Sequence, residues 1–234
     1  MDGEKPESRR DIRFRCTTSS ASSAFERQLR MPSSHFVHIV DDDRSVRESL
    51  ADLLRSMGYR VAQYRSASDF LNADLPDAPT CLVLDVRLPG MSGLELQEYL
   101  AQLNISIPII LMTGFGDISI AVKGMKAGAI DFLIKPIRDQ DLLDAVVAAI
   151  RVDQDRRQEI AKTGALRERY ALLTHRERQV VALVASGLMN KQVANELSIS
   201  EVTVKMHRSN AMQKLGVKSV AKLARMVEIL DISK

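Results

Sequence analysis

The chain has few cysteines and no long apolar run. Only two cysteines, Cys16 and Cys81, occur among 234 residues, and they form neither a metal-binding spacing nor a disulfide framework. Such sparse cysteine use predicts a reducing, cytoplasmic environment. The apolar runs are too short to span a membrane, and no apolar segment follows the arginines near the N-terminus. We therefore expect neither a membrane-bound nor a secreted protein.

The charges are unevenly distributed along the chain. Residues 35–150 hold 10 basic and 16 acidic residues, a net charge of −6, whereas residues 164–234 hold 12 basic and 6 acidic residues, a net charge of +6. This asymmetry indicates an acidic domain joined to a domain that meets a polyanion.

The first 150 residues divide into two parts. Residues 1–34 are rich in serine, threonine and arginine without a sustained apolar period, which predicts a disordered N-terminal extension. Strands and helices then alternate over residues 35–150, the first domain. The five predicted strands are residues 36–40, 60–64, 82–84, 107–112 and 132–134. Because these strands are apolar, we predict an α/β fold: a doubly wound, five-stranded parallel sheet covered on both faces, flavodoxin-like in form.

The remaining chain has helical patterns and no strand. Residues 151–170 are polar with one glycine and no proline, and we expect a helical linker. Residues 171–234 form the second domain, an all-α domain of four helices. The four helical patterns are residues 172–186, 190–197, 201–215 and 219–230. Asn190 and Ser200 are expected to cap the second and third of these helices.

Polar residues follow four of the five predicted strands. Asp41–Asp43 end the first strand, Asp85 the third, Thr113 the fourth and Lys135 the fifth. Ligands of open parallel sheets bind at this edge. The first and third strands are neighbours in such a fold, so the acids converge and repel one another unless a cation neutralises them. Oxygen-only ligands favour Mg²⁺, or Mn²⁺.

This arrangement suits phosphoryl transfer. Asp85 could act as the nucleophile, with the cation, Lys135 and Thr113 stabilising charge on the transferred oxygens. Each residue alone has an ordinary structural explanation, because a single aspartate often caps a turn and a Lys-Pro pair is common in loops. Asp43 is as readily a solvated third acid as a ligand. The combination, with each residue at a strand end, favours the chemical interpretation.

Four segments carry a family resemblance, and it covers roughly residues 35–150. They are VHIVDDD (37–43), LDVRLPGMSG (84–93), LMTGFGD (111–117) and KAGAIDFLIKP (126–136). Their sequence resembles the receiver domain of two-component response regulators. The resemblance implies that Asp85 is the phosphoacceptor and that Asp41 and Asp42 form the acidic pair. The implied metal ligands are Asp42, Asp85 and the Arg87 carbonyl, with Asp41 acting indirectly.

The same resemblance assigns three further residues. Thr113 and Lys135 would hold the phosphoryl group. Phe132 matches an aromatic switch that turns inward when Thr113 moves toward the phosphate. On the sequence alone, burial in the core is the better explanation of Phe132.

The third helix of the second domain has one apolar face. Val204, Ala211 and Leu215 would pack it down, while Met206, Ser209 and Gln213 point the opposite way with Lys205 beside them. Such a helix fits the DNA major groove, with its N-terminal residues on base edges. Lys191, His207 and Arg208 are better placed for phosphates. The structural alternative is a small helical bundle with a solvated face.

Residues 173–217 resemble the LuxR/NarL-type helix-turn-helix. The resemblance implies base contacts from Lys205, Met206 and Ser209. It implies backbone contacts from four residues: Lys191, Thr203, His207 and Arg208. With the receiver, the chain is identified as a member of the FixJ subfamily, and residues 187–208 further resemble StyR-type regulators of aromatic catabolism.

The two resemblances together imply a phosphorylation-dependent transcriptional regulator. A sensor histidine kinase would phosphorylate Asp85, and the receivers would pair through the face that includes Ile118–Gly128. The dimer would bind promoter DNA and recruit RNA polymerase. Such a protein is no enzyme beyond its own phosphorylation and slow dephosphorylation. The last helix carries Leu223, Met226, Val227 and Leu230. Such a stripe is usually core, but we expect a four-helix domain to leave part of it exposed. The resemblance implies that this helix is used for dimerisation on DNA.

Two other interpretations remain open. Asp41-x-Asp43-x-Ser45 resembles the opening motif of haloacid-dehalogenase-like phosphatases, but this interpretation leaves Asp85 unexplained and has no use for the second domain. The other is a phosphorylation-independent DNA-binding protein whose receiver only dimerises. The intact set of acids, threonine and lysine argues against it.

Overall fold

The computed structural model describes residues 35–114 and 118–230. The predicted disordered extension, residues 1–34, lies outside the described residues, as do the last three residues of the segment 111–117. The chain divides into two compact units between Asp155 and Arg156. Within the described residues, no helix combines the length and the apolar character needed to cross a membrane.

The first unit is built on a five-stranded sheet. Its strands are β1 (Phe36–Val40), β2 (Arg60–Tyr64), β3 (Thr80–Asp85), β4 (Ile109–Thr113) and β5 (Asp131–Ile134). They are parallel and lie in the order β2-β1-β3-β4-β5, which confirms the predicted doubly wound fold. Val40 is paired with Leu84 in the β1–β3 register. The residues that follow, Asp41 and Asp85, therefore leave the sheet side by side.

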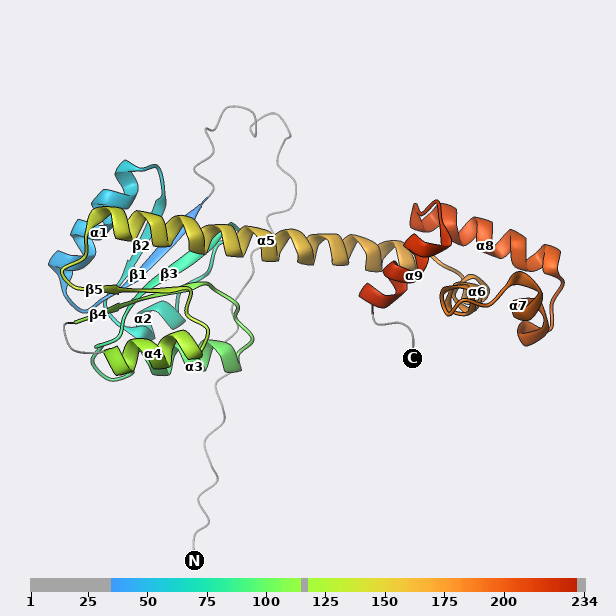
Figure 1. Cartoon of the computed structure of the whole chain (residues 1–234). Coiled ribbons are helices and arrows are strands. Elements are labelled where there is room, and N and C mark those ends of the chain that lie inside the picture. The colour runs from blue at the N-terminus through green and yellow to red at the C-terminus, as the bar shows by residue number, and fades with distance from the viewer. Residues whose placement is uncertain (1–34, 115–117, 231–234) are drawn as a thin grey trace, which may run out of the picture. The chain divides into compact units, whose positions relative to one another are not determined.

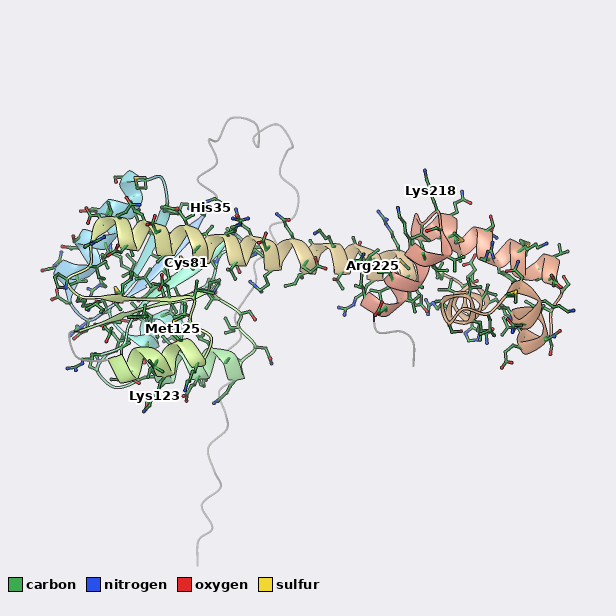
Figure 2. All side chains as sticks on the ribbon, viewed as in Figure 1. His35, Cys81, Lys123, Met125, Lys218 and Arg225 are labelled. Carbon is green, nitrogen blue, oxygen red and sulfur yellow. The ribbon has the colours of Figure 1, made fainter. Side chains whose placement is uncertain are left out.

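Helices cover both faces of this sheet (Figure 1). The helices of the first unit are α1 (Arg44–Ser56), α2 (Ala67–Leu71), α3 (Gly93–Gln102), α4 (Ile118–Lys126) and the start of α5 (Asp139–Ala171). Alternate strand residues face opposite cores: Ile39 packs with α1 and α5, and Leu84 with α2 and α3. Cys81 lies in the first of these cores, on β3 (Figure 2). Burial raises the pKa of its thiol.

Two features of this unit escape the sequence patterns. Helix α2 was not predicted, because five residues are too few to show a helical period; Ser66 caps it by accepting from the Asp69 N–H at 3.1 Å. The second feature is the buried Asp153, within the segment expected to be linker. Its Oδ2 accepts from the Thr80 N–H at 3.0 Å, so α5 is tied to the first residue of β3.

The second unit is helical throughout its described residues. After the C-terminal part of α5 it contains α6 (His175–Ala185), α7 (Asn190–Leu197), α8 (Glu201–Leu215) and α9 (Val220–Ile229). Its core joins residues of all four helices, among them Val180, Val193, Val204 and Leu223. The all-α prediction is confirmed.

The expected exposure of the last helix was wrong. Leu223, Met226, Val227 and Leu230 are all buried, with at most 7% of any side chain exposed. Helix α9 closes the small core with its whole apolar stripe, because α6 packs against it. Its exposed residues include Lys222, Arg225 and Ile229, the last 44% exposed. Figure 2 labels Arg225 and also Lys218, which precedes the helix.

Candidate functional site

Three carboxylates meet at the carboxyl edge of the sheet. Asp41 directly follows β1, and Asp85 is the last residue of the neighbouring strand β3. Both residues are buried. Asp42 is the exposed third member. One oxygen from each carboxylate lies within 4.8 Å of the other two. The structure therefore brings together the three acids that the sequence singled out.

Lys135 bridges the two buried acids. Its ammonium nitrogen lies 2.6 Å from Asp41 Oδ2 and 2.7 Å from Asp85 Oδ2. The Lys135 backbone N–H donates to the Thr113 carbonyl at 2.8 Å, which joins the ends of β4 and β5. Thr113 is buried at the end of β4. The residues predicted to hold a phosphoryl group thus lie at one edge.

Burial and charge act against each other here. Burial raises the pKa of the Asp41 carboxyl, and the hydrogen bond from Lys135 opposes this rise. Burial would lower the pKa of Lys135, but its hydrogen bonds to Asp41 and Asp85 raise it overall. Lys135 is therefore a permanent cation at neutral pH, held between two acids.

The loop after β3 fixes the orientation of Asp85. Its Oδ1 accepts from the Arg87 N–H at 3.1 Å, two residues along the chain. The loop then returns so closely that a Cβ on Gly93 would lie 2.3 Å from the Asp85 carbonyl oxygen. The sequence patterns did not single out Gly93, because only the folded loop shows this approach.

Asp43 has a structural role. Its side chain caps α1, accepting from the N–H groups of Ser45 at 2.8 Å and Val46 at 3.3 Å. These bonds favour a helix-capping role for Asp43 over a role as a metal ligand. They also leave the phosphatase interpretation without its second free acid.

The donor set fits a hard divalent cation. Asp41 uses Oδ1 to accept from the Asp43 N–H at 2.8 Å and Oδ2 to accept from Lys135. Asp85 is engaged in the same way, by the Arg87 N–H and by Lys135, so these bonds do not distinguish Asp41 from Asp85 as a direct ligand. Carboxylate oxygens without nitrogen or sulfur donors are the ligands that Mg²⁺ and Mn²⁺ prefer.

Phe132 departs from its expected burial. It lies on β5 with 38% of its surface exposed, and so does not belong to the core. Ile134, two residues further on the same strand, is 46% exposed. This side of β5 is therefore open to solvent along the strand.

In the second unit, α8 has the predicted two-sided character. Val204, Ala211 and Leu215 are buried, while Met206 is 51% exposed and Ser209 is exposed on the other side. Ser200 caps the helix as predicted, accepting from the Thr203 N–H at 3.1 Å. The outward face of α8 is thus exposed at these residues.

The residues predicted to contact DNA lie on α7 and α8. Lys191 and Lys205 are exposed, whereas Thr203, His207 and Arg208 are half-buried. The prediction that Asn190 caps α7 was wrong. Met189 holds the cap position, and its N–H donates to Gln192 Oε1 at 2.8 Å. Asn190 Oδ1 instead accepts from Arg208 at 2.9 Å, which orients that guanidinium.

An ion pair between a buried glutamate and a partly exposed lysine stabilises the second unit. Glu177, 3% exposed, accepts from Lys214 at 2.8 Å and from the Thr174 N–H at 2.8 Å. The Lys214 ammonium lowers the pKa of Glu177. The sequence patterns missed this pair, because its partners are 37 residues apart.

We expect Lys214→Met to lower the free energy of unfolding of this unit by about 1–3 kcal/mol at pH 7, because it removes a charge-assisted bond to a buried acid. The pKa of Glu177 is lower in the folded state, so the contribution exists above the unfolded pKa of about 4.3 and is lost as pH falls through the folded value. Thermal unfolding followed by circular dichroism should show the gap to wild type narrowing below about pH 4.3. Lys218→Met, at an exposed site, is the control. A gap that stays constant on acidification would contradict the assignment.

Comparison with known proteins identifies the family of each domain. Residues 37–147 match the response regulator receiver domain, and residues 171–227 match the luxR family of bacterial regulatory proteins. Nodulation protein W of Bradyrhizobium diazoefficiens is 53% identical over 197 residues, 84% of this chain and 87% of that protein. The transcriptional regulatory protein FixJ of Azorhizobium caulinodans is 45% identical over 204 residues, 87% of this chain and 96% of that protein. The low-resolution structure of response regulator StyR is 51% identical with a TM-score of 0.74, covering 83% of this chain and 98% of that one.

The chain therefore belongs to the two-component response regulators that pair a receiver domain with a LuxR-type DNA-binding domain. Within that family it is FixJ-like, a transcriptional regulator rather than a classical enzyme, and the predicted similarity to StyR is confirmed.

Proposed function

We propose that Asp85 is the phosphoacceptor through which a sensor histidine kinase controls this regulator. The observation that carries the proposal is the bridge from Lys135 to Asp41 and Asp85 at the carboxyl edge of the sheet. It supplies a nucleophilic carboxylate, a fixed cation and a second acid in one place. Arg87, through its backbone N–H, holds the Asp85 carboxylate in one orientation.

In the transfer step, an Asp85 oxygen attacks the phosphorus atom of the kinase phosphohistidine. An O–P bond forms as the P–N bond breaks, giving an acyl phosphate, and the leaving imidazole takes a proton from solvent. The Lys135 ammonium then bonds to a phosphoryl oxygen, and the Thr113 hydroxyl to another. Asp41 remains paired with Lys135 and keeps its ammonium at the site.

Mg²⁺, or Mn²⁺, would bind Asp42, Asp85 and the Arg87 carbonyl, with Asp41 acting indirectly. When bound, the cation neutralises the acids and the charge that develops on the phosphoryl oxygens. The three converging carboxylates support this assignment.

Phosphorylation would shift the receiver between two states. Thr113 moves toward the phosphoryl group, and Phe132, now 38% exposed, turns inward behind it. The altered face then favours a homodimer, which binds promoter DNA in the cytoplasm and recruits RNA polymerase. The phosphoryl group shifts this equilibrium only through its different affinity for the two states.

We assign these functions to the domains by the boundaries predicted from the sequence. Residues 35–150 act as the receiver, 151–170 as a helical linker and 171–234 as the DNA-binding domain. In the last of these, Lys205, Met206 and Ser209 read bases. Backbone contacts come from Lys191, Thr203, His207 and Arg208.

Intact mass spectrometry tests the phosphoacceptor. After incubation with Mg²⁺ and a small phosphodonor, we expect the wild type to gain one phosphoryl group and Asp85→Asn to gain none. Asp52→Asn removes an acid from α1 whose side chain is 78% exposed, and it should behave as wild type. If no protein gains mass, or if Asp85→Asn gains as much as wild type, the proposal fails.

A further inference from the structure

The outward face of α8 begins with an exposed valine. Val202 is 76% exposed, the largest fraction of any large hydrophobic side chain in the described residues. It occupies the second position of the helix, immediately after Glu201 and the cap residue Ser200. Val202 is not part of the core of the second unit, to which this turn of α8 contributes Val204.

Val202 lies in line with two residues already assigned to base reading. At about 100° per residue, Val202, Met206 and Ser209 fall within about 60° of one another on the helix surface. The buried residues Val204, Ala211 and Leu215 lie on the opposite side. Val202 therefore starts the same surface stripe, at the end of the helix that enters deepest into a major groove.

The folded chain alone gives no reason for valine at this position. A β-branched side chain on an exposed helix turn has lower helix propensity than alanine and gains little from burial. Its neighbour on the stripe, Met206, is also apolar and 51% exposed. Two large apolar side chains one turn apart expose a continuous patch where a solvated surface would carry polar groups.

The surroundings of this patch select its partner. Exposed Lys205 lies beside this stripe, about 60° from Val202 on the helix surface. Lys191 is exposed on α7, next to Asn190, which accepts from Arg208 of α8. An apolar stripe with a lysine beside it, in a segment (residues 164–234) with a net charge of +6, fits duplex DNA, whose phosphates attract the basic residues. The apolar feature that the major groove offers is the C5-methyl group of thymine.

We propose that Val202 is a specificity-determining residue that packs against a thymine C5-methyl group in the bound promoter. The assignment rests on the proposed DNA-binding role of α8 and adds the base and the atom that are read. Val202 and Met206 are separated by about 6 Å along the helix axis, close to two base-pair steps. Each therefore reads its own base pair, and the two contributions are separable.

The first test selects binding sites from random duplexes. The full-length chain, treated with Mg²⁺ and a small phosphodonor, is used at about 0.15 M salt, because phosphate contacts depend strongly on ionic strength. We expect wild type to enrich thymine at one position where Val202→Ala shows little preference. Alanine is a strong helix former at an exposed site, so this variant keeps the fold.

The second test removes only the methyl group. Replacing each thymine of the selected duplex by uracil deletes the C5-methyl group and keeps base pairing and the O4 acceptor. At the Val202 position we expect wild type to lose about fourfold in Kd, the equivalent of one buried methyl-sized group. The same substitution should change the Kd of Val202→Ala less than about 1.5-fold, since no apolar contact is left to lose.

Val220→Ala is the matched control. Val220 is also an exposed valine in the first turn of a helix, follows the cap residue Ser219, and lies on α9. At every position, replacing thymine by uracil should raise the Kd of Val220→Ala by the same factor as the Kd of wild type. The Kd of Met206→Ala should become insensitive to the thymine C5-methyl group at a different base position from that of Val202→Ala.

The outcomes separate the two proposals. If the chain binds a selected duplex but every uracil penalty is the same in wild type and Val202→Ala, the Val202 assignment is wrong and the DNA-binding role stands. In that case the patch serves another partner, such as a protein surface. If the chain binds no duplex with or without the phosphodonor, the proposed function fails together with this inference.

Discussion

Replacing Lys135 with methionine is expected to destabilise the receiver by about 2–4 kcal/mol in the absence of divalent cations, because removal of one partner leaves buried charges uncompensated. Lys135 is the cation between Asp41 and Asp85, whose side chains are 0% and 7% exposed. Hydrogen exchange of the β1 and β3 amides measures the effect locally. Amides that exchange by unfolding of the receiver should exchange roughly 30- to 900-fold faster.

Divalent cation should restore part of this loss. Mg²⁺ binds the folded acid cluster and stabilises it by mass action, and the gain should be larger for Lys135→Met than for wild type. Lys123→Met is the control, because Lys123 is exposed on α4 (Figure 2) and should change stability by less than about 0.5 kcal/mol. If Mg²⁺ raises the stability of wild type and of Lys135→Met by the same amount, Lys135 does not neutralise the charge of Asp41 and Asp85.

Gly93→Ala is the second change expected to have a large effect. The added Cβ would lie 2.3 Å from the Asp85 carbonyl oxygen and 3.0 Å from Val86 Cα, and both of these are backbone atoms. Because no side chain can turn aside, the loop after β3 must move. We expect a loss of about 2–4 kcal/mol in stability, since a contact this short cannot be relieved by rotamer changes. The rate of phosphorylation should fall about 10- to 100-fold as Asp85 is displaced.

Gly90→Ala separates clash from backbone strain in the same loop. Gly90 has a φ of +82°, but no atom lies within 4 Å of the position of an added Cβ. It should therefore cost about 1 kcal/mol in stability, the strain of a left-handed residue. Its phosphorylation rate, measured by time-resolved intact mass with a small phosphodonor, should stay near wild type. If Gly93→Ala phosphorylates as fast as Gly90→Ala, the close approach does not position Asp85.

Much of the site could be predicted because its signals are local. Apolar strands alternating with helices specify a parallel sheet, and polar residues that end such strands meet at one edge whatever the details of packing. Asp41, Asp85, Thr113 and Lys135 were found in this way. In α8, the spacing of Val204, Ala211 and Leu215 identified the buried face, because helical geometry relates those positions directly.

Other features were wrong or missed because they depend on neighbours distant in sequence. Phe132 was expected in the core, but β5 leaves it partly exposed. Asn190 was expected to cap α7, but Arg208, 18 residues away, takes its oxygen. Leu223 and the rest of its stripe were expected to be partly exposed, but α6 covers them. Each outcome is a choice between competing partners, which local periodicity does not record.

By itself, the sequence determined the two kinds of domain, the order of their elements and the identity of the acids and lysine at the sheet edge, since these follow from periodicity and strand ends. Only the tertiary structure decided how those groups act on one another. It showed that Lys135 bridges Asp41 and Asp85, and that the loop after β3 brings Gly93 close to the Asp85 carbonyl oxygen. It also decided that Val202 lies on the outward face of α8 with 76% of its surface exposed. The physical reason is that hydrogen bonds, ion pairs and burial act over a few ångströms, and which residues come that close is settled by packing.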